Sequence, residues 1–397
     1  MKTSRIIQAI LTLVAMMTLT AVTARAQFAV LHHFAIGNDD GGFPYGSPTL
    51  SGSTLYGMTS AGGKNDYGTV FKMKGDGSGY AILHSFGVPV PDHVSAESRG
   101  RAFPYGSPTL SGSTLYGMTL KGGSRDYGTI FRMNCDGSGY TILHAFAGGK
   151  GDGMRPNGTL TLSGSVFYGM TQFGGRKNNG VVFKINSDGS GYTNLHSFAG
   201  GSNDGRNPLG SLTLSGSRLY GMTLGGGRND KGVVFKMNAD GSRYTILHSF
   251  AGGKGDGGSP YGSLTLSGST LYGMTAFNGS GNQGVVFKIN TDGRGYSILH
   301  SFAGGRDGGS CPVGSLTLCN SALYGMTEFG GRTDRGVIFK INTDGSGYSI
   351  VHTFAGGRGD GRGPLGSLVL LGNSLYGMTC NGGNNGNGVV FKLEIVP

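Results

Sequence analysis

The sequence predicts an all-β fold, a seven-bladed β-propeller of four-stranded antiparallel blades. The motif Tyr-Gly-Met-Thr occurs seven times, with a spacing of 52 residues except for 60 between the first two copies. Each period also contains four short runs rich in β-branched and aromatic residues, bounded by Gly, Asn, Asp or Ser. Repeats of this length are typical of propellers and solenoids, and four strands per repeat are typical of a propeller blade. The motif begins at Tyr56, Tyr116, Tyr168, Tyr220, Tyr272, Tyr324 and Tyr376.

Residues 211–250 illustrate the elements expected in one blade. A three-residue turn joins the first two strands, and a six-residue turn around Asp240 and Gly241 joins the last two. This Asp-Gly pair supplies the positive φ that a tight hairpin needs. Beyond residue 26 no stretch has helical periodicity. The expected strands are 211–214, 218–223, 232–237 and 244–250.

The two ends of the chain contain complementary parts of one blade. Residues 28–34 are a copy of the fourth strand, and residues 389–395 are a copy of the third. We therefore expect the N-terminal strand to complete the last blade and close the ring, which leaves no unpaired edge at the seam. Pro48 and Pro108 fall in the expected first strands of blades one and two, at the inner edge, where proline is tolerated.

Residues 1–26 have the features of a secretory signal peptide, and residues 27–397 are expected to form one propeller domain. Lys2 and Arg5 precede a mostly apolar stretch, and residues 24–26 form a small-residue cleavage site. An uncleaved membrane anchor is the alternative. We expect a secreted or periplasmic monomer that is not inserted in a membrane after cleavage.

The mature chain is expected to be basic. Loss of the three basic residues of the signal peptide from a total of 32 leaves 29 basic and 21 acidic residues. For an exported protein, this balance favours weak attraction to acidic polysaccharide or anionic cell surfaces over binding to nucleic acid. The basic residues recur at equivalent places in the repeats, so a simply solvated surface is the other interpretation.

The repeated unit resembles that of a known family. It reads Gly-Val-Val-Phe-Lys-Ile-Asn-x-Asp-Gly-Ser-Gly-Tyr, followed by Leu-His-x-Phe and later by Leu-Tyr-Gly-Met-Thr. This unit is similar to the GloVer tandem repeat of exported bacterial "choice-of-anchor" proteins, and the resemblance covers the whole mature chain. It implies export and supplies no catalytic residues. Such proteins typically carry a C-terminal anchoring segment, whereas residues 393–397 form no hydrophobic tail, so free secretion or periplasmic residence is expected.

Residues present in every blade are expected to serve folding. Tyr and Met of the repeated motif should fill the space between neighbouring blades, and the Gly between them should let adjacent sheets approach closely. Seven repeated His residues are expected to form a buried ring whose nitrogens bond to nearby backbone or Thr groups, with a functional ring as the alternative. These are His32, His84, His144, His196, His248, His300 and His352.

We expect no cofactor and no metal site. The Asn-x-Asp-Gly-Ser-Gly turns resemble the start of a calcium loop, but they lack its closing bidentate Glu. Of the four cysteines, only Cys311 and Cys380 share a face and adjacent blades, and we expect them to remain unbridged. Stability should therefore come from packing between blades.

The candidate binding surface is the face that carries the longer loops, which join strands two and three and successive blades. Long loops on a rigid scaffold are where binding usually occurs. Tyr45, Tyr105 and Tyr261 stand at the exits of these loops. The face also has charged residues in repeated positions, which are Lys64, Arg125, Arg176, Arg228 and Arg332 together with Asp152, Asp204, Asp256, Asp307 and Asp360.

If one special site exists, it is expected where the repeat departs from its own pattern on this face. The connection 87–106 replaces the usual Gly-Asp-Gly loop and contains His93 and Glu97. Neutral variation in exposed loops is the alternative. In the sixth blade a second departure from the repeat comprises Glu328, Arg332 and Asp334, with Arg306 and Asp307 in the preceding loop.

Three functions are compatible with these features. The first is a non-catalytic binding or scaffold module whose partner is a cell-envelope or extracellular polysaccharide or protein. The second is a lectin-like protein in which several blades each hold a glycan, although the absence of Trp removes the best stacking residue. The third is a carbohydrate-active enzyme. Acid–base glycosidase chemistry needs paired carboxylic acids, and the mature chain has only three Glu, at positions 97, 328 and 394.

Overall fold

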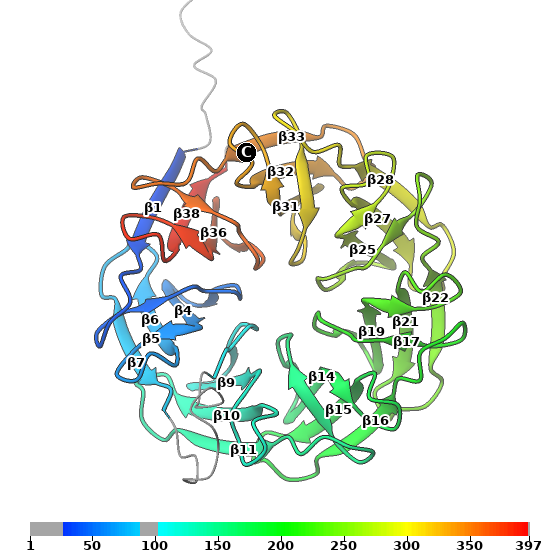
Figure 1. Ribbon diagram of the computed structural model, residues 1–397, viewed down its shortest axis with the longest axis horizontal. Coiled ribbons are helices and arrows are strands. Elements are labelled where there is room, and N and C mark those ends of the chain that lie inside the picture. The colour runs from blue at the N-terminus through cyan, green and yellow to red at the C-terminus, as the bar shows by residue number, and fades with distance from the viewer. Residues whose placement is uncertain (1–26, 88–101, 396–397) are drawn as a thin grey trace, which may run out of the picture.

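The computed structural model describes residues 27–87 and 102–395, and these residues form a closed ring of seven blades around a central channel (Figure 1). Each blade is an antiparallel sheet whose strands follow one another from the channel to the outer wall. The predicted all-β seven-bladed propeller is confirmed. Blade 1 contains β3 (Thr49–Ser51), β4 (Thr54–Thr59), β6 (Thr69–Lys74) and β7 (Ala81–Ser85).

The other blades repeat this order with similar strand lengths. Blade 2 contains β8 (Thr109–Ser111), β9 (Thr114–Thr119), β10 (Thr129–Asn134) and β11 (Thr141–Ala145). Blade 3 contains β13 (Thr161–Ser163), β14 (Val166–Gly174), β15 (Val181–Asn186) and β16 (Thr193–Ser197). Blade 4 contains β18 (Thr213–Ser215), β19 (Arg218–Thr223), β21 (Val233–Asn238) and β22 (Thr245–Ser249). Blade 5 contains β24 (Thr265–Ser267), β25 (Thr270–Thr275), β27 (Val285–Asn290) and β28 (Ser297–Ser301). Blade 6 contains β30 (Thr317–Cys319), β31 (Ala322–Gly330), β32 (Val337–Asn342) and β33 (Ser349–Thr353).

Blade 7 is assembled from both ends of the described chain. It contains β35 (Val369–Leu371), β36 (Ser374–Thr379), β38 (Val389–Glu394) and, as its outer strand, β1 (Gln27–His33). β1 lies beside β38 in Figure 1, and the two strands pair antiparallel with Phe28 opposite Leu393. The predicted closure of the ring by the N-terminal strand is confirmed.

Short paired segments extend the long-loop face above the blades. In six of the seven blades, the end of the preceding inter-blade loop pairs with the second strand or with the segment that follows it, and the described residues of blade 2 form no such strand pair. In blades 3 and 6 this segment pairs directly with the long second strand, as β12 (Gly153–Pro156) with β14 and β29 (Gly309–Pro312) with β31. The separate pairs are β2 (Gly41–Gly42) with β5 (Ala61–Gly62), β17 (Gly205–Arg206) with β20 (Gly225–Gly226), β23 (Gly257–Gly258) with β26 (Phe277–Asn278), and β34 (Gly361–Arg362) with β37 (Asn381–Gly382).

The first strands begin about two residues later than predicted. The expected strand 211–214 is observed at Thr213–Ser215, because the Ser211 N–H donates to the Ser263 hydroxyl of the next blade instead of pairing within its own sheet. For the same reason Pro48 and Pro108 precede β3 and β8 and do not lie inside them. The innermost segment of each blade therefore joins neighbouring blades.

The hydrophobic core is divided into clusters that lie between adjacent blades. Tyr56 and Met58 of blade 1 pack with Leu115 and Phe131 of blade 2, as predicted for the Tyr and Met of the repeated motif. Gly57 serves a purpose different from the predicted one. A Cβ at this position would overlap the ring of Phe71, its cross-strand neighbour in the same blade. The glycine thus makes room for a core phenylalanine of its own sheet.

Candidate functional site

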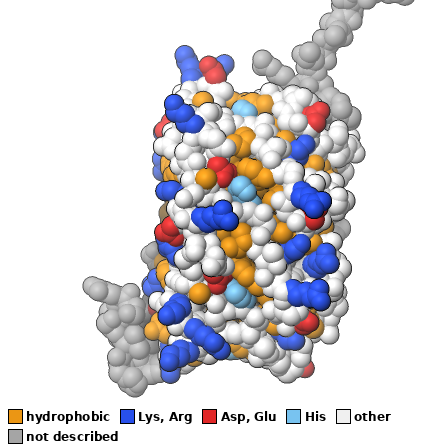
Figure 2. All heavy atoms as spheres, turned by 90° about the vertical axis from the view of Figure 1, so that its right-hand side faces the viewer, with side chains coloured by type: hydrophobic (Ala, Val, Ile, Leu, Met, Phe, Trp, Pro, Cys, Tyr) orange, Lys and Arg blue, Asp and Glu red, His pale blue; other side chains and the backbone are white. Residues whose placement is uncertain are grey.

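The seven repeated histidines lie at the seams between blades, on the outer wall. Each His ring stacks on an aromatic ring of the next blade; the His248 ring, for example, lies 3.7 Å from that of Tyr296. At the closing seam Phe28 of β1 stacks on His352 at 3.8 Å. Figure 2 shows the outer wall as a band of hydrophobic and His side chains between two charged borders.

Five of these histidines bond to an aspartate that lies eight residues later in the chain. The Asp256 carboxylate accepts hydrogen bonds from His248 Nε2 at 3.0 Å, from the Ala251 N–H at 2.8 Å and from the Tyr296 hydroxyl. The prediction that the histidines bond to backbone or Thr groups is therefore wrong for these five seams. The pairs are His32–Asp40, His144–Asp152, His196–Asp204, His248–Asp256 and His352–Asp360.

These pairs also correct the prediction for the aspartates of the inter-blade loops. Asp204 and Asp256 are only 9% and 7% exposed, so they join blades and do not form a polar binding surface. Asp307 differs from them. In its loop Gly308 stands eight residues after His300, where the other loops have the aspartate that bonds to the histidine, and Asp307 itself is exposed. The repeated carboxylates are therefore structural at these seams.

Replacing Asp256 with asparagine is expected to destabilise the protein by about 2 kcal/mol at neutral pH, because a buried carboxylate with charged-group hydrogen bonds is lost. Burial alone would raise the pKa of Asp256, but the hydrogen bonds from His248, Tyr296 and the Ala251 amide outweigh it and lower the pKa. Because the pKa of Asp256 is lower in the folded than in the unfolded protein, its ionisation stabilises the fold at any pH above the unfolded pKa of about 4. This stabilisation is lost as the pH falls through the pKa of the folded protein. The deficit of Asp256→Asn in urea unfolding should therefore shrink below about pH 4.

The matched control is Asp307→Asn, which removes the same charge from the exposed position of an equivalent loop. This substitution is expected to change the free energy of unfolding by less than about 0.5 kcal/mol. Equal effects of the two substitutions across the pH range would show that the seam carboxylates do not stabilise the ring.

A second ring of contacts surrounds the channel on the long-loop face and was not predicted. The sequence Pro-x-Gly followed by Ser or Thr occurs once before each first strand. The N–H of each Ser or Thr donates to the hydroxyl oxygen of the equivalent residue in the next blade, at 2.6 to 3.0 Å, and the bond from Ser367 to Ser47 closes the circle. The members are Ser47, Ser107, Thr159, Ser211, Ser263, Ser315 and Ser367.

The glycines of this sequence allow the segments to approach one another. A Cβ on Gly210, for example, would overlap the carbonyl oxygen of Gly262 in the next blade, and each of the other six glycines has the same relation to its neighbour. The segments therefore form a closed backbone ring, here called the mouth ring, consisting of residues 46–47, 106–107, 158–159, 210–211, 262–263, 314–315 and 366–367.

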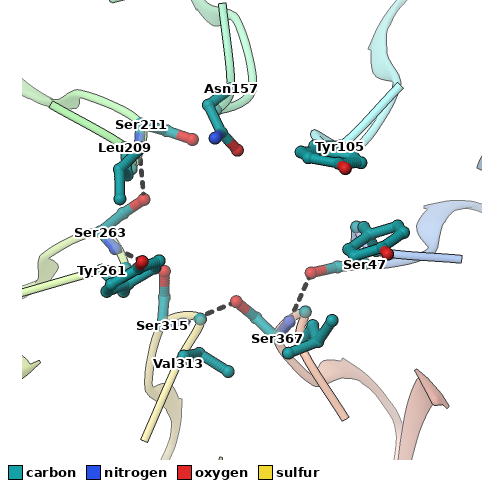
Figure 3. A pocket seen from close by; sticks show the side chains of 18 of the residues that line it. Ser47, Tyr105, Asn157, Leu209, Ser211, Tyr261, Ser263, Val313, Ser315 and Ser367 are labelled. Atoms are coloured by element: carbon teal, nitrogen blue, oxygen red, sulfur yellow. Dashed lines mark hydrogen bonds between the residues drawn. The ribbon is translucent and has the colours of Figure 1, made fainter. Parts of the chain in front are cut away.

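The mouth ring lines a cavity of about 700 Å³ at the end of the channel (Figure 3). This volume lies within the range of about 300–1,000 Å³ that is common for small-molecule sites. The residue between Pro and Gly contributes its side chain to the cavity wall in every blade. The seven are Tyr45, Tyr105, Asn157, Leu209, Tyr261, Val313 and Leu365.

The cavity wall is asymmetric, and its exposed aromatic rings gather on blades 5 and 6. Tyr261, Phe277 and Phe329 all line the cavity, and they are 41%, 48% and 44% exposed. Gln283 and Ser310, which bond to each other, line the same part of the wall. This combination of exposed aromatic faces and polar side chains, here called the blade 5–6 patch, is the candidate binding site.

Glu328 is the only charged residue among the described residues of the cavity wall. It is half-buried, and the Cys311 thiol donates to its carboxylate at 3.7 Å. Burial raises the pKa of Glu328. Burial, with the neighbouring carboxylate, also raises the pKa of the Cys311 thiol to about 12, so the thiol is neutral. The four cysteines, which all lie in the described part of the chain, are free.

The structure separates the residues of the predicted site. Glu328 lines the cavity, whereas Arg306, Asp307, Arg332 and Asp334 do not, and all four of these are exposed. Asp334 accepts a hydrogen bond from the Gly330 N–H at 2.8 Å and so closes the loop after β31. His93 and Glu97 lie outside the described residues.

Sequence reasoning missed the two phenylalanines of the blade 5–6 patch. Both stand two residues after the Thr of the repeated motif, where blades 1, 2, 4 and 7 have no aromatic residue. Phe173 of blade 3 occupies the same position, and it lies beneath the guanidinium of Arg155 at 5.7 Å. Comparing this single column of the seven repeats would have indicated the patch. Of the predicted loop-exit tyrosines, Tyr45 and Tyr105 also line the cavity, with ring centres 4.2 Å apart.

Two further observations concern metals and membranes. In the parts of the chain that the structure describes, no three His, Cys, Asp or Glu side chains are grouped so that they could hold a metal ion. Between residues 27 and 87 and between 102 and 395, no helix is long and apolar enough to cross a membrane.

Comparisons with known proteins identify the repeat and the fold. The family model described as the Gloeobacter/Verrucomicrobia repeat matches residues 87–276 and 267–396, which confirms the resemblance seen in the sequence. No curated protein sequence gives a significant match.

The similar solved structures include two oligogalacturonate lyases. One, solved in complex with manganese, is 11% identical with a TM-score of 0.56, and the match covers 94% of this chain and 93% of the lyase. The other, from Vibrio parahaemolyticus, is 9% identical with a TM-score of 0.52, covering 94% of this chain and 97% of that one. At these identities the similarity concerns the propeller fold alone.

Proposed function

The chain belongs to the Gloeobacter/Verrucomicrobia repeat family, and from this premise and the geometry of the channel mouth we propose that it is an exported, non-catalytic propeller that binds an oligosaccharide. The signal-like residues 1–26 support export to the periplasm or the medium. The site is the blade 5–6 patch, and its ligand is a component of the cell envelope or of extracellular polysaccharide.

The observation that carries this proposal is the group of three exposed aromatic rings on one side of the cavity. An aromatic face provides large contact area for the apolar C–H face of a sugar ring, and the hydroxyl of a Tyr adds a polar group at its edge. Gln283, Ser310 and Glu328 place amide, hydroxyl and carboxylate groups beside those rings for sugar hydroxyls. The site needs no Trp, because Tyr and Phe supply the stacking surfaces.

Two features favour this function over the alternatives. Glycosidase acid–base chemistry uses two carboxylic acids on either side of the bond, and the described cavity wall contains one, Glu328. The repeated loop aspartates were the candidate sugar-binding groups of a lectin with an equivalent site in each blade, and the carboxylates of Asp152, Asp204 and Asp256 are engaged at the seams. A single site at the mouth is therefore favoured.

Replacing Phe277 and Phe329 together with alanine is expected to weaken oligosaccharide binding by about 20- to 30-fold. Each exposed ring is taken to contribute about 1 kcal/mol of stacking, and 1.4 kcal/mol corresponds to a factor of ten in affinity. A glycan array on the purified mature chain would select the oligosaccharide, and titration calorimetry would measure its affinity for each variant.

The matched control is the double replacement of Ile142 and Leu371 with alanine. These side chains are 45% and 37% exposed and lie outside the cavity wall, so their loss should leave affinity unchanged. Unaltered binding by a folded Phe277→Ala, Phe329→Ala protein would place the ligand elsewhere on the propeller.

A further inference from the structure

We propose that the oligosaccharide carries an amino sugar, and that Glu328 binds its ammonium group at the blade 5–6 patch; this inference rests on the proposed function. The class of ligand follows from the charge of the cavity wall. Among the described wall residues there is no Lys, Arg or His, and Glu328 supplies the only charge. A wall of this kind complements a cationic or neutral ligand and offers no cationic partner to the carboxylate of a uronic acid.

The fold itself does not require a carboxylate at this position. The equivalent residue directly follows the Thr of the repeated motif, and in the other six blades it is uncharged at neutral pH. Blade 6 therefore has a charge that its six counterparts lack, at a place that faces the cavity. The equivalent residues are Ser60, Leu120, Gln172, Leu224, Ala276 and Cys380.

Glu328 also lacks a cationic partner within the described part of the protein. No Lys, Arg or His of those residues forms an ion pair with it, and its hydrogen-bond donor is the weak thiol of Cys311. Removing a carboxylate from water without a counter-ion is costly, and burial accordingly raises its pKa. A ligand ammonium group would act as the counter-ion of Glu328, and their attraction would offset the desolvation cost of the carboxylate.

The aromatic rings of the patch suit the same ligand. The electron-rich face of Tyr or Phe attracts a cation as well as the C–H face of a sugar ring. Tyr261 lines the same cavity, and burial, followed by Cys311 and then Glu328, raises the pKa of its hydroxyl. Glu328 and Phe329 both line the cavity. An amino sugar can therefore place its ring on an aromatic face and its ammonium at the carboxylate.

This inference reverses the expectation drawn from net charge. The basic residues within 27–87 and 102–395 lie outside the cavity wall, so their long-range attraction of acidic polysaccharide would act on the outer surface. Inside the cavity the described wall is negatively charged, because Glu328 is its only charged residue. Selectivity at the mouth should thus favour amino sugars over uronic acids.

The test is titration calorimetry of the full mature chain with hexamers of glucosamine, N-acetylglucosamine and galacturonic acid, and with trilysine. We expect the glucosamine hexamer to bind at least tenfold more tightly than the N-acetylated hexamer. Glu328→Gln should remove this preference while the N-acetylated hexamer keeps its affinity within about twofold. Phe277→Ala with Phe329→Ala should weaken binding of both hexamers. The matched control Asp307→Asn removes a charge from the loop that precedes blade 6, outside the cavity wall, and should leave the preference intact.

Each contrary outcome identifies what has failed. Equal binding of the two glucosamine-type hexamers, or equal weakening of both by Glu328→Gln, would overturn the amino-sugar assignment and leave the proposed function standing. Tighter binding of galacturonic acid hexamer or of trilysine would overturn it as well. If none of the three hexamers bound and a glycan array also gave no ligand, the proposed function would fail together with this inference.

Discussion

Replacing Gly210 of the mouth ring with alanine is expected to destabilise the folded protein by about 2–4 kcal/mol. The added Cβ would overlap the carbonyl oxygen of Gly262 in the next blade. Since that oxygen belongs to the backbone, relief requires the two innermost segments to separate, which also lengthens the bond from the Ser211 N–H to the Ser263 hydroxyl, now 2.7 Å. Overpacking costs about 1–3 kcal/mol, and a broken hydrogen bond adds about 1 kcal/mol.

The matched control is Gly255→Ala in the neighbouring inter-blade loop. An ideal Cβ at Gly255 meets no atom within 4 Å, and its φ lies outside the left-handed region. This substitution should change the free energy of unfolding by less than about 0.5 kcal/mol. The measurement is urea unfolding followed by far-ultraviolet circular dichroism. If both variants unfolded at the same urea concentration, the mouth ring would not be a source of stability.

Removing residues 27–33 from the mature chain is expected to have the largest effect on stability, a loss of more than about 5 kcal/mol or failure to fold. The deletion removes all of β1, which leaves β38 as an unpaired edge and opens the ring at blade 7. It also removes Phe28, which stacks on His352 and packs in the cluster between blades 6 and 7. Phe28 is half-buried, so its loss alone should cost less than the about 3–5 kcal/mol typical of a fully buried Phe, and the loss of the whole strand accounts for the larger expected effect.

Two additional measurements make this deletion informative. Gln27→Ala, at the exposed start of the same strand, should leave the melting temperature unchanged. A synthetic peptide of residues 27–33, added to the deleted chain, should raise its melting temperature in a concentration-dependent way, because it binds only the folded ring. A deleted chain that melts within about 2 °C of the mature protein would refute closure by β1.

The sequence predicted the architecture because the same physical problem is solved seven times. Each blade needs a Tyr and a Met between sheets, a Gly opposite a core Phe, and glycine-rich turns, so the repeat is visible as a pattern at one spacing. The two half-blades at the ends predicted the closing pair of strands for the same reason. The constant repeat spacing therefore predicts both the number of blades and the pairing of the two end strands.

The contacts between blades were harder to predict because they join residues that no local pattern relates. The partner of Ser367 is Ser47, 320 residues away in sequence. The bond between His248 and Asp256 spans only eight residues. It forms because the loop after the strand folds back on that strand, and the pattern of apolar and polar residues does not predict the course of a loop. Expectations for His and Asp therefore failed at the same seams.

The candidate site was predicted in part. Glu328 was identified because it breaks the repeat, and it lies in the cavity wall. Arg332 was grouped with it because the two are close in sequence, but Glu328 belongs to β31 and faces the channel, whereas Arg332 lies in the exposed loop beyond that strand. Proximity along the chain could not distinguish these two directions.

The mouth ring has a consequence for how the wall of the cavity can vary. Every contact that closes it is made by a backbone amide, a Ser or Thr hydroxyl or a glycine, and the residue between Pro and Gly takes no part in these bonds. That residue is Tyr, Asn, Leu or Val in this protein, on an otherwise constant backbone. Ring closure and the side chains of the cavity wall are thereby assigned to different positions of one short motif. At the partly exposed positions Tyr45, Tyr105 and Tyr261, the wall of the cavity can change by single substitutions while the contacts that close the ring are kept.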